Sequence, residues 1–549
     1  MAWYDEAIFY HIYPLGMTGA PKQNFYGEPE HRLKTLFPFI SQIKKLGCNA
    51  LYIGPLFESV GHGYETTDYK KLDTRLGTNE DLTEFVAECH KQGIRVVLDG
   101  VFNHTGRDFF AFQDVKRNRE SSPYRDWYCN VNFNGNNEYN DGFSYDNWGG
   151  YDLLAKLNQH NPEVREYICE VIRFWVKEFD IDGIRLDAAD VLDFSYMQMM
   201  RQVANETKPD FWLMGEVIHG DYTRWVNGDT LHCVTNYHLH KALYSGHNDH
   251  NYFEIAHTVK RLYEMGGNRP DGLKLYNFVD NHDVERIYTK LNNKSHFIPV
   301  HILMYTLPGV PSVYYGSEFG IEGQKQRGSD DSLRPAISHE QYINSTEKND
   351  LTNLISRLGE IRLEAKTLSY GDYKELFLTT GQYAFARNYN GKSVLVTVNN
   401  SNDDFVMNLS TQNTGEYVGG LSGKHVSVKD GHISVNVKAN SGEIWLPIGE
   451  NDKVIQPLEL NIVEKTAEMA TPEKTAEPTN AEKNEKFVKT DKISKLKHNK
   501  SFEEMTVEEL QEAILERMKQ NGLVTEQMKK DVLENIYHNS LVTWIKSFN

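Results

Sequence analysis

The sequence is short of positive charge, which argues against two classes of partner. Its 549 residues contain 59 Lys and Arg but 77 Asp and Glu, so the formal net charge is −18. Nucleic acids and anionic membranes both need a basic surface on the protein that binds them. We therefore expect no nucleic-acid partner and no membrane partner, whereas a neutral substrate remains compatible.

Cysteines and long apolar segments are also scarce. The five Cys residues are an odd number without a Cys-x-x-Cys pair, so reduced, buried thiols in a reducing compartment are expected. The first residues (MAWYDEA) contain no basic segment and no apolar run, and no stretch is long enough to cross a bilayer. A cytoplasmic location without a signal peptide is the resulting prediction.

Apolar segments of strand length alternate with amphipathic helical segments over the first two thirds of the sequence. The expected strands are 8–15, 50–55, 95–102, 183–189, 211–217, 233–238, 274–281 and 312–316. The clearest helices between them are 32–46, 79–92 and 163–179. Eight such repeats predict an α/β fold, a (β/α)8 TIM barrel over 1–368. A doubly wound open sheet is the alternative, but no Gly-rich phosphate loop supports it.

One connection of the predicted barrel, 105–158, is too long for a simple loop and is expected to form an inserted domain. It is rich in aromatic residues, namely Phe109, Phe110, Tyr124, Trp127, Tyr128, Phe133, Tyr139, Phe143, Tyr145 and Trp148. Their rings have two possible roles, stacking on sugars or forming the core of the insert itself. The sequence leaves both open.

The pattern changes after the barrel. Short alternating runs separated by Asn-Gly or Asp-Gly turns predict an antiparallel β-sandwich over 369–450. Residues 451–500 are rich in Glu, Lys, Thr, Ala and Pro, which is typical of a disordered linker. Residues 501–549 predict a helical hairpin with an apolar stripe, whose role is open: it can dock on this chain, form a homo-oligomer or bind a partner.

Three acidic residues stand at the ends of three predicted strands. Asp187 ends the segment DGIRLD, Glu216 lies in MGEV, and Asp283 ends FVDNHD. Cleavage of a bond between two sugars needs one carboxylic acid to protonate the leaving oxygen and one carboxylate to meet the oxocarbenium-like carbon. Because active sites of (β/α)8 barrels form at the carboxyl ends of the strands, these acids predict a glycosidase site.

The neighbours of the acids indicate how each would work. Arg185 is two residues before Asp187 and shares its face of the strand, so it is expected to lower the pKa of that carboxyl and keep it ionised. Glu216 lies between Met214 and Val217, an apolar setting that favours the protonated form of a general acid. Two histidines, His104 and His282, are expected to bind hydroxyl groups of the sugar together with Asp283.

Six segments together resemble the α-amylase family, glycoside hydrolase family thirteen, over about 1–450. They are 63–69 (GYETTDY), 99–104 (DGVFNH), 183–187 (GIRLD), 215–216 (GE), 281–283 (NHD) and 309–318 (GVPSVYYGSE). The resemblance implies that Asp187 is the nucleophile, Glu216 the acid/base and Asp283 the stabiliser of the transition state. It also implies that Tyr64 stacks on the sugar at the cleaved bond.

Within that family, segment 154–158 (LAKLN) is similar to a signature of the neopullulanase and cyclomaltodextrinase subgroup. His219, which follows Glu216, is also similar to that subgroup. The resemblance therefore adds Lys156 and His219 to the expected substrate-binding residues. The sequence departs from the subgroup at 188–191 (AADV) and at 280–283 (DNHD). Because the predicted barrel starts almost at Met1, the N-terminal β-sandwich that usually precedes the barrel in that subgroup is not expected.

No cofactor is expected to be required, although calcium is possible. In calcium-dependent relatives the asparagine of the first signature segment is a ligand, which here is Asn103. Oxygen ligands are too common in any sequence for Asn103 alone to establish a calcium site.

The sequence thus predicts a retaining hydrolase that cleaves α-1,4-glucosidic bonds of maltodextrins and other α-glucan oligosaccharides. A cyclomaltodextrinase or neopullulanase, or an α-glucosidase with transglycosylation, is the alternative among enzymes. A glucan-binding protein without catalysis is a remote alternative, because all three acids are present.

Overall fold

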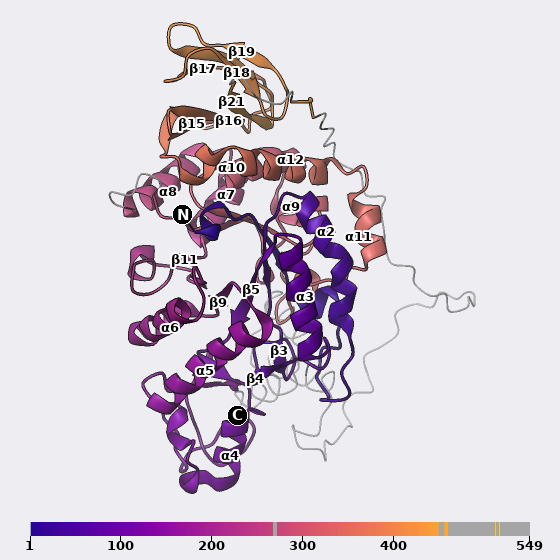
Figure 1. Cartoon of the computed structure of the whole chain (residues 1–549), viewed down its shortest axis with the longest axis vertical. Coiled ribbons are helices and arrows are strands. Elements are labelled where there is room, and N and C mark those ends of the chain that lie inside the picture. Colours follow the sequence, from indigo (N-terminus) through magenta and orange to yellow (C-terminus); the bar gives the residue numbers. More distant parts are fainter. Residues whose placement is uncertain are drawn as a thin grey trace, which may run out of the picture. The chain divides into compact units, whose positions relative to one another are not determined.

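Eight parallel strands lie side by side in chain order in the computed structural model (Figure 1). A bridge between Thr235 and Tyr276 joins the two outer strands of this sheet, so the sheet closes into a barrel. The barrel strands are β1 (Phe9–Ile12), β2 (Ala50–Ile53), β5 (Arg95–Gly100), β9 (Gly183–Leu186), β10 (Trp212–Gly215), β11 (Cys233–Val234), β12 (Tyr276–Phe278) and β13 (Val310–Tyr314). The predicted (β/α)8 barrel is confirmed.

The structure describes residues 2–266, 272–448, 455–458, 460, 511 and 515. The chain divides into two units, 1–466 and 467–549, and almost all of the second unit lies outside the described residues. Almost all of the predicted linker and helical hairpin therefore lies outside them too. Among the described residues, no helix is long and apolar enough to cross a membrane.

Helices alternate with the barrel strands, and several of them begin at a side-chain cap. They are α2 (Phe37–Lys45), α3 (Asn79–Lys91), α5 (Pro162–Phe179), α6 (Phe194–Thr207), α7 (Tyr237–Asn248), α8 (Tyr252–Met265), α10 (Phe297–Thr306) and α12 (Asp350–Glu364). Helix α5 begins where the Asn161 side chain accepts from two backbone N–H groups and Pro162 occupies the first turn. It ends at Asp180, which adopts a left-handed conformation.

The sixth barrel strand is much shorter than the predicted strand 233–238. Strand β11 contains only Cys233–Val234, and helix α7 already begins at Tyr237. The reason is Asn236, whose side-chain oxygen accepts from the backbone N–H of Leu239 at 3.2 Å and caps the helix. An asparagine cap was not visible inside a run of apolar and aromatic residues.

Two extensions carry site residues on the carboxyl side of the barrel. The first is the hairpin of β3 (Phe57–Ser59) and β4 (Thr66–Leu72), with Tyr64 in its turn. The second is the insert, which contains β6 (His104–Thr105), α4 (Phe110–Asn118), β7 (Asn147–Trp148) and β8 (Tyr151–Lys156). In the insert, β6 and β7 both pair with β8, so the insert has a three-stranded sheet of its own.

Most aromatic rings of the insert form its own core. Half of the ten are buried: Phe109, Trp127, Tyr128, Phe143 and Tyr145. Phe110, Tyr139 and Trp148 are exposed, at 45%, 45% and 39%. The Tyr139 ring is covered by the guanidinium of Arg107, which lies 3.7 Å from its centre. Trp148 is the exposed ring that lies next to a predicted site residue, His104.

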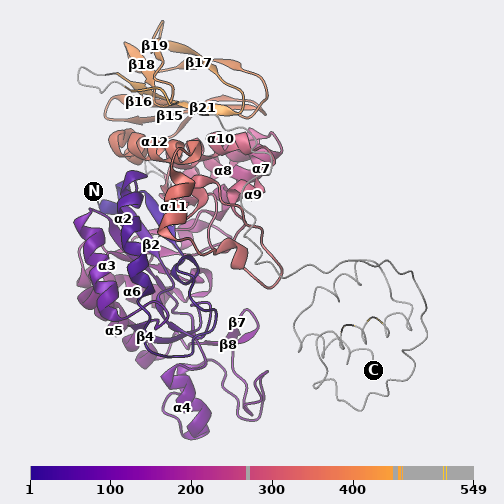
Figure 2. The same cartoon turned by 90° about the vertical axis from the view of Figure 1, so that its right-hand side faces the viewer.

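The C-terminal β-domain has two antiparallel sheets, as expected for 369–450. The larger contains β14 (Lys374–Leu378), β15 (Gln382–Tyr389), β16 (Lys392–Asn399), β21 (Ser441–Pro447), β18 (Glu416–Gly419) and β19 (His425–Ser427). The smaller pairs β17 (Phe405–Ser410) with β20 (His432–Val437). In both views β15, β16 and β21 lie over helices α10 and α12 (Figure 1, Figure 2), away from the strand ends that carry the acids.

Candidate active site

The three acidic side chains follow three barrel strands at the same end of the barrel. Asp187 comes directly after β9, Glu216 directly after β10, and Asp283 lies on the loop after β12. The backbone N–H groups of Asp187 and Glu216 donate to the carbonyls of Gly100 and Leu186, at 3.1 and 2.9 Å. The barrel hydrogen bonds thus continue up to both acids and fix where their side chains begin.

One buried guanidinium contacts two of these acids. Arg185 Nη1 donates to Asp187 Oδ1 at 2.8 Å, and its Nη2 lies 2.8 Å from Glu216 Oε2. The same Nη1 contacts both oxygens of Asp99, at 2.9 and 3.0 Å. Because the two carboxyl groups share one planar group, they lie within a few ångströms of each other. The predicted contact of Arg185 with Asp187 is present.

The expected lowering of the Asp187 pKa is wrong, although the arginine is where the sequence placed it. Burial raises the pKa of Asp187 well above its ordinary value, and the negative charges of Glu216 and Asp99 raise it further. Arg185 acts in the opposite direction but is shared among three carboxylates. One positive charge among three negative ones cannot offset the loss of solvent. The free site therefore favours keeping a proton.

The apolar setting predicted for Glu216 is also wrong. Its carboxylate accepts from the backbone N–H of Ala188 at 3.1 Å and from the Tyr237 hydroxyl at 3.4 Å, besides its contact with Arg185. Met214 is buried and packs within the barrel. Ala188 itself has a φ of +47°, a left-handed conformation that costs energy for a residue with a side chain. That conformation directs its N–H at the acid.

Asp283 has a different environment. His282 Nε2 lies 3.0 Å from its Oδ2, and Arg334 Nη2 donates to its Oδ1 at 2.8 Å. Burial raises the pKa of this carboxyl, but His282 and Arg334 outweigh burial and hold it well below its usual range. Lys325 Nζ also donates to the main-chain carbonyl of Asp283, at 2.7 Å. Asp283 is therefore a fixed negative charge, whereas burial favours the protonated form of Asp187.

Two further predicted residues, Tyr64 and His104, form one wall of the site. The Tyr64 ring stacks on His282, with centres 5.8 Å apart and an interplanar angle of 12°. Its hydroxyl hydrogen-bonds His282 and donates to Asp99 at 3.3 Å. His104 Nε2 lies 3.2 Å from the carbonyl of Tyr64, and burial lowers the pKa of His104 to about 4. The ring of Trp148 lies 6.0 Å from that of His104.

Lys156 and His219 stand further from the acids. The backbone of Lys156 on β8 pairs with His104 on β6, and its side chain is half-buried. His219 is exposed, three residues after Glu216. Within the part of the chain that the structure describes, no hydrogen bond or ion pair joins either side chain to the three acids. Their predicted role in substrate binding therefore stays a prediction.

The surroundings of Asn103 do not fit a calcium ion. Its side-chain oxygen accepts from Gln159 Nε2 at 3.1 Å, and its nitrogen lies 3.2 Å from His104 Nδ1. Calcium needs six to eight oxygen ligands, but here an N–H donor faces the one side-chain oxygen that Asn103 offers. Within the described ranges, no cluster of three or more His, Cys, Asp or Glu side chains is placed to hold a metal.

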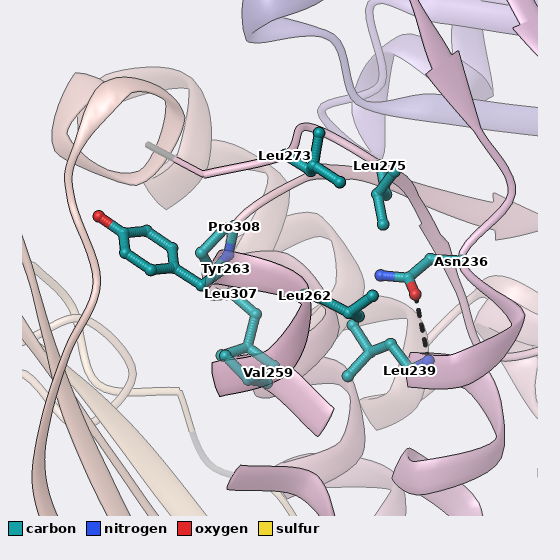
Figure 3. Close-up of a pocket in the computed structure, with 9 residues that line it drawn as sticks. All are labelled: Asn236, Leu239, Val259, Leu262, Tyr263, Leu273, Leu275, Leu307 and Pro308. Atoms are coloured by element: carbon teal, nitrogen blue, oxygen red, sulfur yellow. Dashed lines mark hydrogen bonds between the residues drawn. The ribbon is translucent and has the colours of Figure 1, made fainter. Parts of the chain in front are cut away.

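One small cavity is lined by other residues (Figure 3). It is lined by apolar side chains of α7 and α8, such as Leu239 and Val259, and by Leu275 and Pro308, which precede β12 and β13. Its volume is about 20 Å³, which is too small for a sugar ring. None of the three acids lines it, so it belongs to the packing between barrel and helices.

Three residues of the site were not predicted from the sequence. Tyr237 is the first residue of α7 and contacts Glu216, Arg334 follows β13 and contacts Asp283, and Gln159 follows β8 and contacts Asn103. Each is a single residue on a loop or helix end, with no spacing that singles it out. The SLRPAI segment around Arg334 offered the best signal, since it follows the last barrel strand.

Comparison with known proteins identifies the family. The profile described as "Alpha amylase, catalytic domain" matches residues 38–362, more than half of the chain, and "Alpha-amylase C-terminal domain" matches residues 371–445. The chain belongs to the α-amylase family. It is therefore a glycoside hydrolase, and the acid-lined end of the barrel described above is the candidate active site of an α-amylase family enzyme.

Relatives in this family carry several names. A cyclomaltodextrinase of Thermoanaerobacter pseudethanolicus is 33% identical over 435 residues, covering 74% of this chain and 72% of that protein. Neopullulanase 2 of Thermoactinomyces vulgaris is 29% identical, covering 80% and 78%. A solved debranching enzyme of Nostoc punctiforme is similar with a TM-score of 0.69 and 27% identity, covering 81% of this chain and 99% of that one. The predicted similarity to the neopullulanase and cyclomaltodextrinase subgroup is confirmed.

Proposed function

We propose that this α-amylase family enzyme hydrolyses α-1,4-glucosidic bonds of maltodextrins with retention of configuration at the anomeric carbon. The observation that carries the proposal is the single guanidinium of Arg185, which contacts Asp187 and Glu216 at 2.8 Å each. Retaining glycosidases need their two carboxyl groups about 5 Å apart, whereas inverting enzymes need a wider gap for a water molecule. Two acids on one guanidinium support the narrow spacing.

In this proposal the two acids divide proton donation and nucleophilic attack between them. Glu216 donates a proton to the leaving glycosidic oxygen while the ionised Asp187 attacks the anomeric carbon and forms a glycosyl ester. The deprotonated Glu216 then takes a proton from water, which attacks the ester and releases Asp187. Both acids contact Arg185, which supports their acting on opposite sides of the same glycosidic bond.

Asp283 and the aromatic wall complete the proposed site. Asp283 is held ionised by His282 and Arg334, so it offers a fixed negative charge to the positive oxocarbenium-like carbon. The Tyr64 ring offers a face on which the sugar at the cleaved bond can stack. Trp148, exposed beside His104, is the candidate for contact with a neighbouring sugar. These roles agree with those that the family resemblance implies.

Cyclic maltodextrins are the second candidate substrate class. Two observations favour them: the segment LAKLN at 154–158, and a relative named cyclomaltodextrinase that is 33% identical. The product pattern from maltoheptaose, β-cyclodextrin and pullulan separates the candidates. Hydrolysis of maltoheptaose to mixed short products supports the main proposal, and faster opening of β-cyclodextrin supports the second. Release of glucose alone would indicate an α-glucosidase, and no hydrolysis of any of the three would contradict the proposal.

We also propose a cytoplasmic location, as the sequence led us to expect. A relative from Bacillus subtilis that bears the name intracellular maltogenic amylase is 28% identical and supports it. The five cysteines agree, since all are free and four are buried. Fractionation of cells that produce the full chain tests the location, and recovery of the enzyme outside the cytoplasm would contradict it.

A further inference from the structure

A chain of four hydrogen bonds runs from the start of helix α6 to the turn that carries Tyr64. The backbone N–H of Asp193 donates to Gln159 Oε1 at 2.6 Å. Gln159 Nε2 donates to Asn103 Oδ1 at 3.1 Å. Asn103 Nδ2 lies 3.2 Å from His104 Nδ1, and His104 Nε2 lies 3.2 Å from the carbonyl of Tyr64. We call these contacts the Gln159 relay.

The two ends of the relay fix the direction of every bond in it. A backbone N–H can only donate, so the oxygen of the Gln159 amide faces Asp193 and its NH2 group faces Asn103. The side-chain oxygen of Asn103 then accepts from Gln159, so the NH2 group of Asn103 faces His104. The Nδ1 of His104 must therefore accept with its lone pair, so the ring hydrogen is on Nε2. That hydrogen points to the carbonyl of Tyr64, which can only accept.

The relay is closed to solvent, so reversing the direction of its hydrogen bonds costs free energy. Gln159, Asn103 and His104 are 6%, 0% and 1% exposed. Turning one amide around would place two donors or two acceptors face to face, and a buried group left without its partner costs about 1–3 kcal/mol. The backbone on either side is also held, since Arg165 Nε donates to the carbonyl of Gln159 at 2.6 Å and the N–H of Leu157 donates to that of Asn103 at 3.0 Å.

We propose that Gln159 is a positioning residue of this active site: through Asn103 it fixes the Nε2–H tautomer of His104 and thereby holds Tyr64 in place. Gln159 touches no reacting atom. Its effect reaches the substrate through the last bond of the relay, because Tyr64 stacks on His282 and presents the ring against which the sugar lies. The neutral amide also occupies the side-chain oxygen of Asn103 that an ion would need.

Gln159→Glu is the sharpest test, since it changes one N–H donor into an acceptor at nearly constant shape. The carboxylate can still accept from the N–H of Asp193, but Asn103 must turn its NH2 group toward the carboxylate. The oxygen of Asn103 then faces His104 Nδ1, which takes the hydrogen. Nε2 becomes a lone pair and can no longer donate to Tyr64. Gln159→Met removes the relay without reversing it.

Gln42→Glu is the matched control for the new negative charge. Gln42 lies on helix α2 and is not part of the relay. Among the residues that the structure describes, its side chain accepts only from Lys45, at 3.4 Å. It tests whether any change comes from adding a carboxylate to this acidic protein rather than from reversing the relay.

The tautomer is read by NMR of the full-length protein labelled with ¹⁵N-histidine, because the two ring nitrogens give different shifts when one is protonated. The signal of His104 is the one lost in His104→Asn. We expect a protonated Nε2 in the wild type and in Gln42→Glu, and a protonated Nδ1 in Gln159→Glu. A protonated Nδ1 in the wild type, or an unchanged tautomer in Gln159→Glu, would overturn the proposal. The wild-type spectrum decides even if a variant does not fold.

Kinetics on maltoheptaose tests the positioning role and rests on the proposed function, whereas the NMR does not. We expect Gln159→Glu to lower kcat/KM about tenfold, mostly through KM, because loss of one oriented bond to Tyr64 weakens sugar stacking. Gln159→Met should lower it less, and Gln42→Glu should not change it. A reversed tautomer with unchanged kinetics would overturn the positioning role. An inactive wild type would instead contradict the proposed function alone.

Discussion

Arg334 donates from Nη2 to Oδ1 of Asp283 at 2.8 Å, and from Nε to the main-chain carbonyl of His282 at 3.0 Å. One guanidinium therefore holds both the charge and the backbone of the third acid. It enters from the loop after the last barrel strand, whereas Arg185 serves the acid pair from within the barrel. The site thus has two arginines with separate tasks, and only the one in the barrel could be predicted from its motif.

We expect Arg334→Gln to lower kcat/KM by about ten- to a hundredfold at neutral pH, since a charge-assisted hydrogen bond contributes about 1.5–3 kcal/mol. The acid side of the pH profile should also move to higher pH, because Asp283 loses a cation that lowers its pKa. Arg334→Lys keeps the positive charge but not the contact with the carbonyl of His282. Its pH profile should therefore be closer to that of the wild type than its kcat/KM is. An unchanged profile in Arg334→Gln would contradict this account of Asp283.

Removal of either member of the acid pair should abolish hydrolysis while the protein stays folded. We expect Asp187→Asn and Glu216→Gln each to lower kcat by several orders of magnitude, because the nucleophile and the acid act as a unit. The double variant should be little worse than either single one. Residual turnover of maltoheptaose near that of the wild type, in a variant with unchanged circular dichroism, would show that the acids are misassigned.

Asp187 should destabilise the folded protein at neutral pH. Burial and its acidic neighbours raise the pKa of Asp187 in the folded state above its unfolded value, so this carboxyl lowers stability as pH rises from about 4 through the folded pKa. Asp187→Asn should therefore raise the free energy of unfolding at pH 7, and the gain should vanish toward pH 4. Denaturant unfolding at both pH values measures it, and a loss of stability at pH 7 would contradict the assigned direction.

Chelation should leave the enzyme unchanged. Asn103 gives its side-chain oxygen to Gln159, so the position at which calcium-dependent relatives bind an ion does not fit one here. Exhaustive treatment with EDTA should shift the melting temperature by less than about one degree and should not change kcat, since a ligand that is not bound cannot stabilise the fold. A loss of activity that calcium alone restores would show that a calcium site exists.

The barrel and its three acids could be predicted because both follow from local pattern. Apolar strand segments that alternate with helices fix the barrel, and Asp187, Glu216 and Asp283 each end such a segment. Strand β11 was overestimated because Asn236 caps a helix inside an apolar run. That cap is recognised only from the hydrogen bond it makes, and the same residue type also occurs within strands.

The electrostatics of the site could not be predicted in the same way. From sequence, Asp187 has one visible charged neighbour, Arg185, whereas in the fold Asp99 and Glu216 join them from neighbouring strands and the whole group is buried. The sign of a pKa shift depends on that full set and on the loss of water, both of which need the three-dimensional arrangement. Gln159 was missed for the same reason, since its partners are distant in the chain.

The central claim is that Asp187 and Glu216 lie close enough for a double displacement, and the anomer of the first product tests it most directly. Proton NMR during early turnover of a maltooligosaccharide resolves the new reducing end before it equilibrates between its two anomers. The account predicts that the α-anomer appears first, because two successive inversions at the anomeric carbon retain its configuration. An initial burst of the β-anomer would contradict it, since a single displacement by water inverts the anomeric carbon and needs a wider gap between the two carboxyl groups.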